Sequence, residues 1–387
     1  MSGRRRRVLV AGGGVGGLAA ALALHRAGWE AQVFERAGEI GEVGAGLQLG
    51  ANGWRALFAL GVAERVEAGA FAAPAIEMRR GRGGALLAAV PLGARWGAPH
   101  LCVHRADLVA ALLAALPQGA VRTGAEASGY ETGPGGAALR LASGETVEGD
   151  LVIGADGLRS RIREAMLGPE APRFTGFVAW RATVPAEAAP GAPRCVTAWT
   201  GAGRHAVTYP LRGGRLLNFV GLVREDWRNE GWTEPGDPAA LRALFPGWAP
   251  PLARLLEAVE APFRWALFDR PPLPRWSDGA ALLLGDAAHP MLPSLAQGAA
   301  QALEDAVALA ARLDGATEIP AALRAHFAAR IGRVSRVQAE ARANLARFHR
   351  DDPVTRLGIR AVHRLAPGWF ARRLDWLYAG PGGGRHH

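Results

Sequence analysis

The chain has 387 residues, 49% of them hydrophobic, which fits a globular protein of two or three domains. Its net charge is +10, yet it contains no Lys, and its 45 basic residues are all Arg spread along the chain. Because this Arg is not gathered in one patch beside aromatic residues, we do not expect nucleic-acid binding. No apolar run approaches the ~20 residues of a membrane span. The two cysteines, Cys102 and Cys195, have no metal or redox spacing, so we expect them to be reduced and structural.

The N-terminal segment has the pattern of a nucleotide-binding unit. A strand, a glycine-rich turn, a helix and a second strand are predicted over residues 8–11, 12–17, 18–26 and 30–35. The G-x-G-x-x-G spacing is supplied by Gly12, Gly14 and Gly17. Glu35 ends the second strand about 18 residues later, near the ~20 expected of the acid that binds ribose hydroxyls. The basic and apolar start also resembles a secretory signal peptide, but the glycine spacing and the acid favour a dinucleotide site, for FAD or for NAD.

Further motifs follow in the first half of the chain. They are GAGLQL at 44–49 followed by a helix over 52–61, HRADL at 104–108 opening another helix, DLVIGADGLRSRIR at 150–163, and FVAWR at 177–181. The third has the form of a strand, a turn at Asp156 and Gly157, and a helix.

Alternating apolar residues predict a sheet in the middle of the chain. The strands are expected over 195–199, 206–210 and 216–223, with a hairpin signal at 213–214. His205 and Tyr209 are four residues apart, so on a regular strand they share one face. They are candidates for a base and a hydrogen-bond donor; the alternative is a half-buried His and a packed Tyr.

The segment LGDAAHPMLPSLAQGAAQALED at 284–305 predicts a strand, a turn and a helix that opens near Gln297. A helix N-terminus carries unpaired N–H groups, which suit an anion or an electron-rich ring edge. Asp286 precedes that helix, and His289 in the turn is either a structural residue bonded to the backbone or a catalytic one. Ala/Arg-rich sequence over 321–348 predicts a long helix, shorter helices follow to 378, and the tail with His386 and His387 is expected to be inert.

Together these motifs resemble the single-component FAD-dependent aromatic hydroxylases, of the salicylate hydroxylase, 3-hydroxybenzoate 6-hydroxylase and 6-hydroxynicotinate 3-monooxygenase type. The resemblance implies an α/β (α+β) fold with a Rossmann-like FAD-binding domain of the p-hydroxybenzoate hydroxylase type, an inserted β-sheet substrate domain and C-terminal helices. The expected pieces are 1–72, 98–173 and 270–330 for the FAD-binding domain, 73–97 and 174–269 for the substrate domain, 331–379 for the C-terminal helices, and 380–387 for a flexible tail.

The resemblance also implies the chemistry. NADH or NADPH would reduce FAD, O₂ would form a C4a-hydroperoxide on it, and an aromatic or heteroaromatic substrate, phenolic or carboxylated, would be hydroxylated. The residues implied to bind FAD are Gly12, Gly14, Gly17, Glu35, Arg36, Ala45, Arg105, Asp156, Asp286, Gly298 and Ala299. The catalytic candidates are His205, Tyr209, Gln48 and Gln297. Ser294 stands where relatives often have an aromatic residue, which predicts a roomier pocket.

Other interpretations of the same motifs keep flavin binding and change the reaction or the role. Epoxidation or decarboxylative hydroxylation would keep the cofactor and change the product. A flavin-binding sensor would need a partner-binding segment that the sequence does not show. A flavin-dependent halogenase needs a pocket Lys, which this chain lacks. We expect a cytoplasmic monomer or homodimer with no metal, no membrane and no nucleic acid among its partners.

Overall fold

The computed structural model describes residues 5–41, 46–229 and 234–379. Within these residues, six strands form a sheet whose neighbours are parallel except at β19. In spatial order they are Ser277–Asp278 (β19), Ala281–Leu283 (β20), Leu151–Gly154 (β12), Arg7–Ala11 (β1), Glu30–Phe34 (β2) and Val121–Arg122 (β8). The central strands β1 and β12 are buried almost throughout, as expected of a parallel sheet covered on both faces. The predicted N-terminal β-α-β unit is confirmed.

Helices cover this sheet and connect it to its neighbours. Helix α1 (Val15–Arg26) is apolar on nearly all sides because it lies between the sheet and α8 (Gly298–Leu313). This part of the chain also forms two small sheets, with the strand orders β11-β10-β9 and β3-β7-β4. The helices are Val15–Arg26 (α1), Ala51–Ala59 (α2), Ala63–Gly69 (α3), Arg105–Leu113 (α4), Arg161–Leu167 (α5) and Gly298–Leu313 (α8). The small strands are Gly46–Leu49 (β3), Phe71–Ala72 (β4), Leu101–His104 (β7), Ala127–Gly133 (β9), Gly136–Leu141 (β10) and Thr146–Gly149 (β11).

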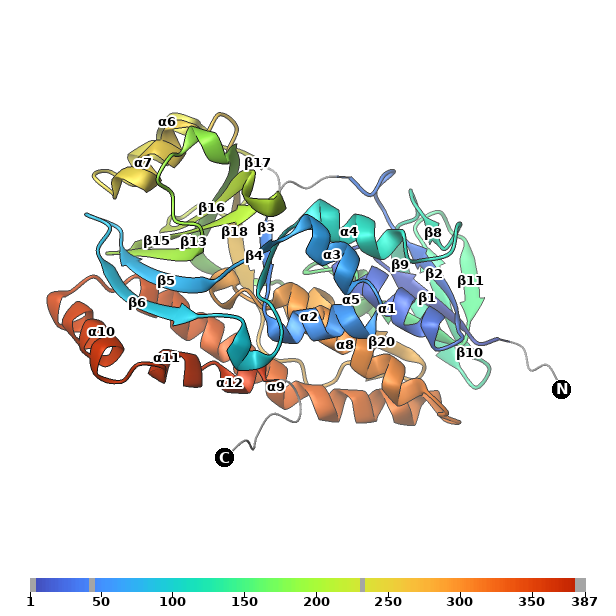
Figure 1. Ribbon diagram of the computed structural model, residues 1–387. Coiled ribbons are helices and arrows are strands. Elements are labelled where there is room, and N and C mark those ends of the chain that lie inside the picture. Colours follow the sequence, from blue (N-terminus) through green and yellow to red (C-terminus); the bar gives the residue numbers. More distant parts are fainter. Residues whose placement is uncertain (1–4, 42–45, 230–233, 380–387) are drawn as a thin grey trace.

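The middle of the chain forms a second large sheet, which in the described residues has eight strands. In spatial order they are Glu234–Pro235 (β17), Phe263–Asp269 (β18), Arg173–Pro185 (β13), Leu216–Arg224 (β16), Arg204–Leu211 (β15), Val196–Gly201 (β14), Ala75–Arg80 (β5) and Leu86–Pro91 (β6). One face packs against Pro238–Ala243 (α6) and Pro250–Glu257 (α7), seen at the upper left of Figure 1. The predicted alternation is confirmed: Ala206 packs toward these helices, whereas His205 and Val207 line a cavity on the other face.

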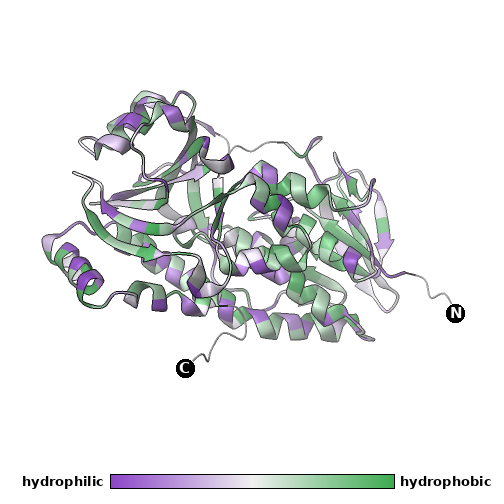
Figure 2. Ribbon diagram, in the orientation of Figure 1, coloured by the Kyte–Doolittle hydropathy of each residue, from purple (hydrophilic) through white to green (hydrophobic). Residues whose placement is uncertain are grey.

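The C-terminal helices run under both sheets (Figure 1). They are Ile319–Phe348 (α9), Pro353–Leu365 (α10), Trp369–Arg372 (α11) and Asp375–Tyr378 (α12). Asp375 anchors the last of them, because its carboxylate accepts hydrogen bonds from Arg95 Nε at 2.8 Å and Trp96 Nε1 at 2.9 Å. Figure 2 shows hydrophilic and hydrophobic residues alternating along α9 and α10, as expected of helices with one solvent-exposed side.

Short 3₁₀ turns span Ala94–Trp96, Ala186–Ala188, Arg212–Gly214, Gly285–Ala287 and Pro293–Leu295. Both cysteines are buried and free, as expected. No helix in the described residues is both long and apolar enough to span a membrane. The division of the chain into a discontinuous FAD-binding domain and an inserted substrate domain stays a prediction.

Candidate active site

One large cavity is lined by both large sheets, the start of α8 and the C-terminal helices. Its volume is about 2090 Å³. Pockets for a single small ligand measure about 300–1,000 Å³, so this cavity has room for a dinucleotide and a second ligand side by side. Of the predicted site residues, Gly17 does not line it and Ala45 lies outside the described residues; all the others line it.

The glycine-rich turn leaves the N-terminus of α1 open to the cavity. A Cβ on Gly14, the N-cap residue, would meet no protein atom within 4 Å, so the space in front of the helix is free for a ligand. Gly12 has φ +105°, and a Cβ there would lie 2.4 Å from the Ala155 carbonyl oxygen. Gly17 serves packing, since its Cβ would lie 1.9 Å from the Gly12 carbonyl oxygen. An exposed helix N-terminus with this clearance fits a pyrophosphate.

Two acids flank that turn. The Glu35 carboxylate at the end of β2 accepts hydrogen bonds from the backbone N–H groups of Gly13 at 2.6 Å and Ala37 at 2.9 Å. Asp156 accepts from the backbone N–H of Arg161 at 2.7 Å, and burial raises the pKa of its carboxyl. Both acids lie along the edge of the cavity where a dinucleotide would extend from α1.

The other end of this cavity region is formed by the turn before α8. Asp286 lines it, and burial raises the pKa of its carboxyl, while the nearby charges of His289 and Arg105 act in the opposite direction. Arg105 opens α4 and lines the same cavity, and its role toward a cofactor stays a prediction. Gly298 and Ala299 present the first backbone N–H groups of α8. These N–H groups suit an electron-rich ring edge.

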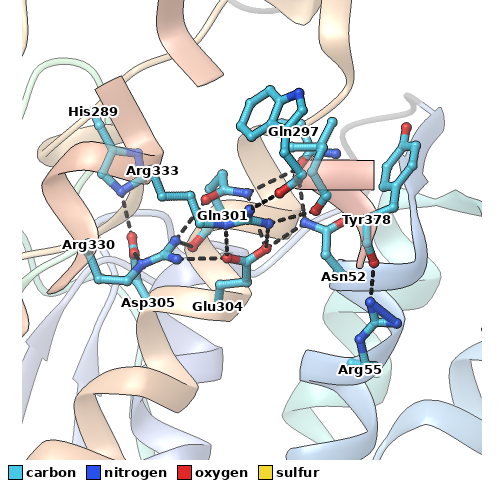
Figure 3. Close-up of polar contacts among 12 residues, drawn as sticks. Asn52, Arg55, His289, Gln297, Gln301, Glu304, Asp305, Arg330, Arg333 and Tyr378 are labelled. Carbon is cyan, nitrogen blue, oxygen red and sulfur yellow. Dashed lines mark hydrogen bonds and ion pairs between the residues drawn. The ribbon is translucent and has the colours of Figure 1, made fainter. Parts of the chain in front are cut away.

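A buried polar network lies behind the start of α8 (Figure 3). Gln297 is 2% exposed, and its Oε1 accepts hydrogen bonds from Asn52 on α2 and Gln301 on α8. Glu304 on the next turn of α8 pairs with Arg330 and Arg333 of α9. The network therefore joins α2, α8 and α9 directly beneath Gln297, which lines the cavity.

His289 belongs to this network and not to the cavity lining. Its Nε2 lies 2.5 Å from Oδ2 of Asp305, a fully buried carboxylate that also accepts from Arg330 Nε at 2.7 Å. Burial works against ionisation of Asp305, but His289 and Arg330 outweigh it and lower the pKa of its carboxyl. The expected backbone partner of the His289 side chain is corrected to this carboxylate.

The cavity face of the eight-stranded sheet is apolar except for a few side chains. Val207, Val220 and Leu222 line it between His205 and Tyr209 of β15 and Arg181 of β13. Burial lowers the pKa of Arg181 to about 10, so the guanidinium stays charged at neutral pH, and it stacks 4.0 Å from the centre of the Trp265 ring. Burial raises the pKa of Tyr209 well above its usual range, so its hydroxyl stays protonated and can donate.

His205 is fully buried and paired with a second histidine. Its Nδ1 lies 2.7 Å from Nε2 of His349, the C-cap residue just after α9, and its buried Nε2 has no partner in the described residues. Burial first, and then the neighbouring His349, hold the pKa of His205 well below its ordinary value. His205 is therefore a neutral imidazole at pH 7.

Two further predicted residues are also placed. Gln48 lines the cavity and its Oε1 lies 3.1 Å from Nε2 of the buried His100. Ser294 lines it too, and its hydroxyl donates to the Ala341 carbonyl oxygen. Sequence reasoning missed Arg181, His349 and Asn52 as site residues. Arg181 ends the FVAWR motif and carried a signal, whereas no local pattern marks the other two.

Comparisons with known proteins agree with this geometry. A family model described as an FAD binding domain matches residues 5–319. The chain belongs to this FAD-binding family. It is 41% identical to a 3-amino-4-hydroxybenzoate 2-monooxygenase of Streptomyces platensis, over 100% of this chain and 99% of that protein. It is 37% identical to 3-hydroxybenzoate 6-hydroxylase 1 of Aquipseudomonas alcaligenes, over 96% and 97% of the two chains.

Solved structures show the same fold. A salicylate hydroxylase substrate complex superposes with a TM-score of 0.83 at 28% identity, covering 97% of this chain and 96% of that one. Klebsiella pneumoniae HpxO complexed with FAD and uric acid superposes with a TM-score of 0.86 at 29% identity, covering 98% and 97%. The predicted fold class is confirmed. The protein is an FAD-dependent monooxygenase of the aromatic hydroxylase class that uses NAD(P)H as co-substrate.

Proposed function

We propose that this enzyme hydroxylates a small phenolic aromatic acid, of the hydroxybenzoate or hydroxynicotinate class. The observation that carries the proposal is Arg181, a half-buried cation on a largely apolar cavity face, near Tyr209. A guanidinium on a largely apolar cavity wall is stabilised by an anionic partner, and a ring carboxylate supplies one. The relatives include hydroxylases of 3-amino-4-hydroxybenzoate, 3-hydroxybenzoate and 6-hydroxynicotinate, which supports the same class.

The side chains divide the work of orienting and activating the ring. Arg181 binds the carboxylate, and the protonated Tyr209 hydroxyl donates a hydrogen bond to the substrate. His205 accepts the phenol proton at Nε2, and its Nδ1–H donates to His349 Nε2. Loss of the phenol proton makes the substrate ring more electron-rich. The apolar side chains around them exclude water.

The cofactor is proposed to lie along the N-termini of α1 and α8. Gly12 and Gly14 would admit the pyrophosphate, Gly17 would let the turn pack closely enough to do so, and Glu35 would hold the ribose. Arg36, Arg105, Asp156 and Asp286 would hold the chain between the two ends, and Gly298 and Ala299 the ring edge. When bound and reduced by NAD(P)H, the flavin would activate O₂ and supply the oxygen atom that is transferred to the ring. We further propose that the enzyme acts in the cytoplasm as a monomer or homodimer.

A panel of hydroxybenzoates and hydroxynicotinates tests the proposal. NADH and NADPH consumption is compared with peroxide release and with the hydroxylated product. A carboxylated phenol is expected to stimulate consumption with little peroxide. Stimulation only by compounds without a phenol or a carboxylate would overturn the substrate class, and an epoxide or a decarboxylated product would indicate the corresponding alternative reaction.

Replacing Arg181 tests the carboxylate contact. We expect Arg181→Met to raise KM for a carboxylated phenol about 10- to 150-fold, because a hydrogen bond to a charged group contributes about 1.5–3 kcal/mol. The matched control is Arg264→Met, whose guanidinium lies 4.3 Å from the Trp227 ring centre and does not line the cavity. An equal rise for the same phenol without its carboxylate would show that Arg181 does not bind that group.

A further inference from the structure

The two ends of the Gln297 side-chain amide have opposite chemistry at the cavity. If Nε2 faces the ligand, Gln297 donates a hydrogen bond; if Oε1 faces it, Gln297 accepts one. Carboxamide ends are nearly alike in shape, so their orientation has to be derived from their partners. The network in Figure 3 contains a carboxylate, which only accepts hydrogen bonds, and guanidinium groups, which only donate them. These charged groups fix the orientation of the amides between them.

The orientation of Gln297 follows from two charged side chains. Asn52 Nδ2 donates to Gln297 Oε1 at 3.0 Å and to Glu304 Oε1 at 2.6 Å. An ionised carboxylate only accepts, so the NH₂ end of Asn52 must face Glu304. On the other side, Gln301 Oε1 accepts from Arg330 Nη2 at 2.8 Å, and because a guanidinium only donates, Gln301 directs its Nε2 to Gln297 Oε1 at 3.0 Å.

Glu304 is held in the ionised state that this orientation requires. Burial opposes its ionisation, but Arg333 and Arg330 outweigh burial and lower the pKa of Glu304. Arg333 binds it through Nε at 2.8 Å and Nη2 at 2.8 Å, and Arg330 through Nη1 at 2.7 Å. The carboxylate is therefore charged throughout the neutral pH range.

Asn52 shows that the arrangement has a cost. With both contacts made through Nδ2, its Oδ1 is buried and has no partner in the described residues. An unsatisfied buried carbonyl costs roughly 1–3 kcal/mol. Turning the amide over would place Oδ1 against the Glu304 carboxylate and the Gln297 oxygen, which is worse, so the network keeps one orientation at the expense of one hydrogen bond.

We propose that Glu304 through Asn52, and Arg330 through Gln301, fix the Gln297 amide with its N–H group toward the substrate, so that Gln297 donates to the phenolate oxygen. The proposal rests on the proposed function for the identity of that oxygen. Gln297 Oε1 already accepts two hydrogen bonds, and Nε2 is the end without a partner in the described residues, on a side chain that lines the cavity. Asn52, Gln301 and Glu304 are positioning residues, because they act through Gln297.

The phenol pKa of bound substrate tests this chain of contacts. In the holoenzyme, 3-hydroxybenzoate is titrated by its absorbance. Gln297→Leu and Asn52→Leu are each expected to lower the phenolate-to-phenol ratio about tenfold at a given pH, the scale of one lost hydrogen bond to a charged group. In the Gln297→Leu background, Asn52→Leu is expected to have no further effect on this ratio, although it still lowers the melting temperature.

Gln338→Leu is the matched control. Gln338 is a buried amide on α9 that donates to the Pro290 carbonyl oxygen at 3.0 Å and does not line the cavity. It is expected to lower stability and leave the phenol pKa unchanged. Two results would overturn the positioning role. Asn52→Leu could leave the phenolate-to-phenol ratio unchanged in the wild-type background, or it could change that ratio equally in both backgrounds.

Neutron diffraction of deuterium-exchanged crystals of the holoenzyme tests the orientation without any substrate. Two deuterons are expected on the cavity end of the Gln297 amide, and deuterons on the end that faces Asn52 would overturn the proposal. If no phenolic acid in the panel binds, the proposed function fails, and the deuteron positions still decide the orientation.

Discussion

His205→Gln is expected to lower kcat by about 100- to 10,000-fold, the range that general base catalysis typically contributes. The substitution keeps a polar side chain of similar size but removes the nitrogen that accepts the phenol proton. FAD content and KM for a carboxylated phenol are expected to change much less, because Arg181 and the N-terminus of α8 remain in place. Steady-state kinetics at saturating NAD(P)H measure the difference.

The pH dependence of kcat/KM tests whether His205 acts as the base. Burial and His349 hold the pKa of His205 well below its ordinary value of 6.5, and burial lowers the pKa of His349 itself to about 4, with Arg224 adding to the shift. A base acts when neutral, so activity is expected to stay level above pH 6.5 and to fall only as the pH drops below that value. His205→Gln is expected to lose this acid limb.

His326→Gln is the control for the loss of a buried histidine. His326 is 0% exposed and does not line the cavity, so this change is expected to affect stability and to leave the pH profile as it is in the wild type. A wild-type profile that falls already between pH 8 and 7, or one that His205→Gln leaves intact, would show that His205 is not the base.

Two alanine substitutions in the glycine-rich turn are expected to remove FAD for different reasons. In Gly17→Ala the methyl group would lie 1.9 Å from a backbone oxygen, so the turn must move. Overpacking of this kind typically costs about 1–3 kcal/mol. We expect a lower melting temperature of the FAD-free chain and protein purified largely without flavin.

Gly14→Ala places its methyl group in open space at φ −75°, a backbone conformation that alanine adopts freely. The melting temperature of the FAD-free chain is expected to stay near the wild-type value, whereas the Kd for FAD rises at least about tenfold, because the methyl group occupies the approach of the pyrophosphate. The ratio of flavin to protein absorbance after gel filtration, and thermal unfolding without FAD, separate the two variants.

Gly332→Ala serves as the control for these variants. Gly332 lies on an exposed face of α9, where a Cβ meets no other atom within 4 Å. A small gain in stability is expected there, since alanine favours a helix by about 1 kcal/mol. Unchanged FAD binding in Gly14→Ala would mean that the pyrophosphate does not approach this helix N-terminus.

The parts of the site that lie in one short segment could be predicted from the sequence. The turn from Gly12 to Gly17, the acid at Glu35 and the helix after Gln297 each depend on local rules: a backbone without a Cβ, a strand period of two, a helix N-terminus. For the same reason the spacing of His205 and Tyr209 was enough to place both on one face of β15. These patterns also carried the family resemblance, and with it the fold class and the cofactor.

The partners of these residues could not be predicted, because they come from segments far apart in the chain. His349 meets His205 only where the end of α9 passes under the sheet, and Asn52 reaches Gln297 across 245 positions. His289 bonded to Asp305 instead of to the backbone for the same reason. The sequence by itself determined the elements and the cofactor motifs. Only the tertiary structure decided which nitrogen or oxygen of each side chain faces the ligand, because hydrogen bonds between distant segments form when the chain packs.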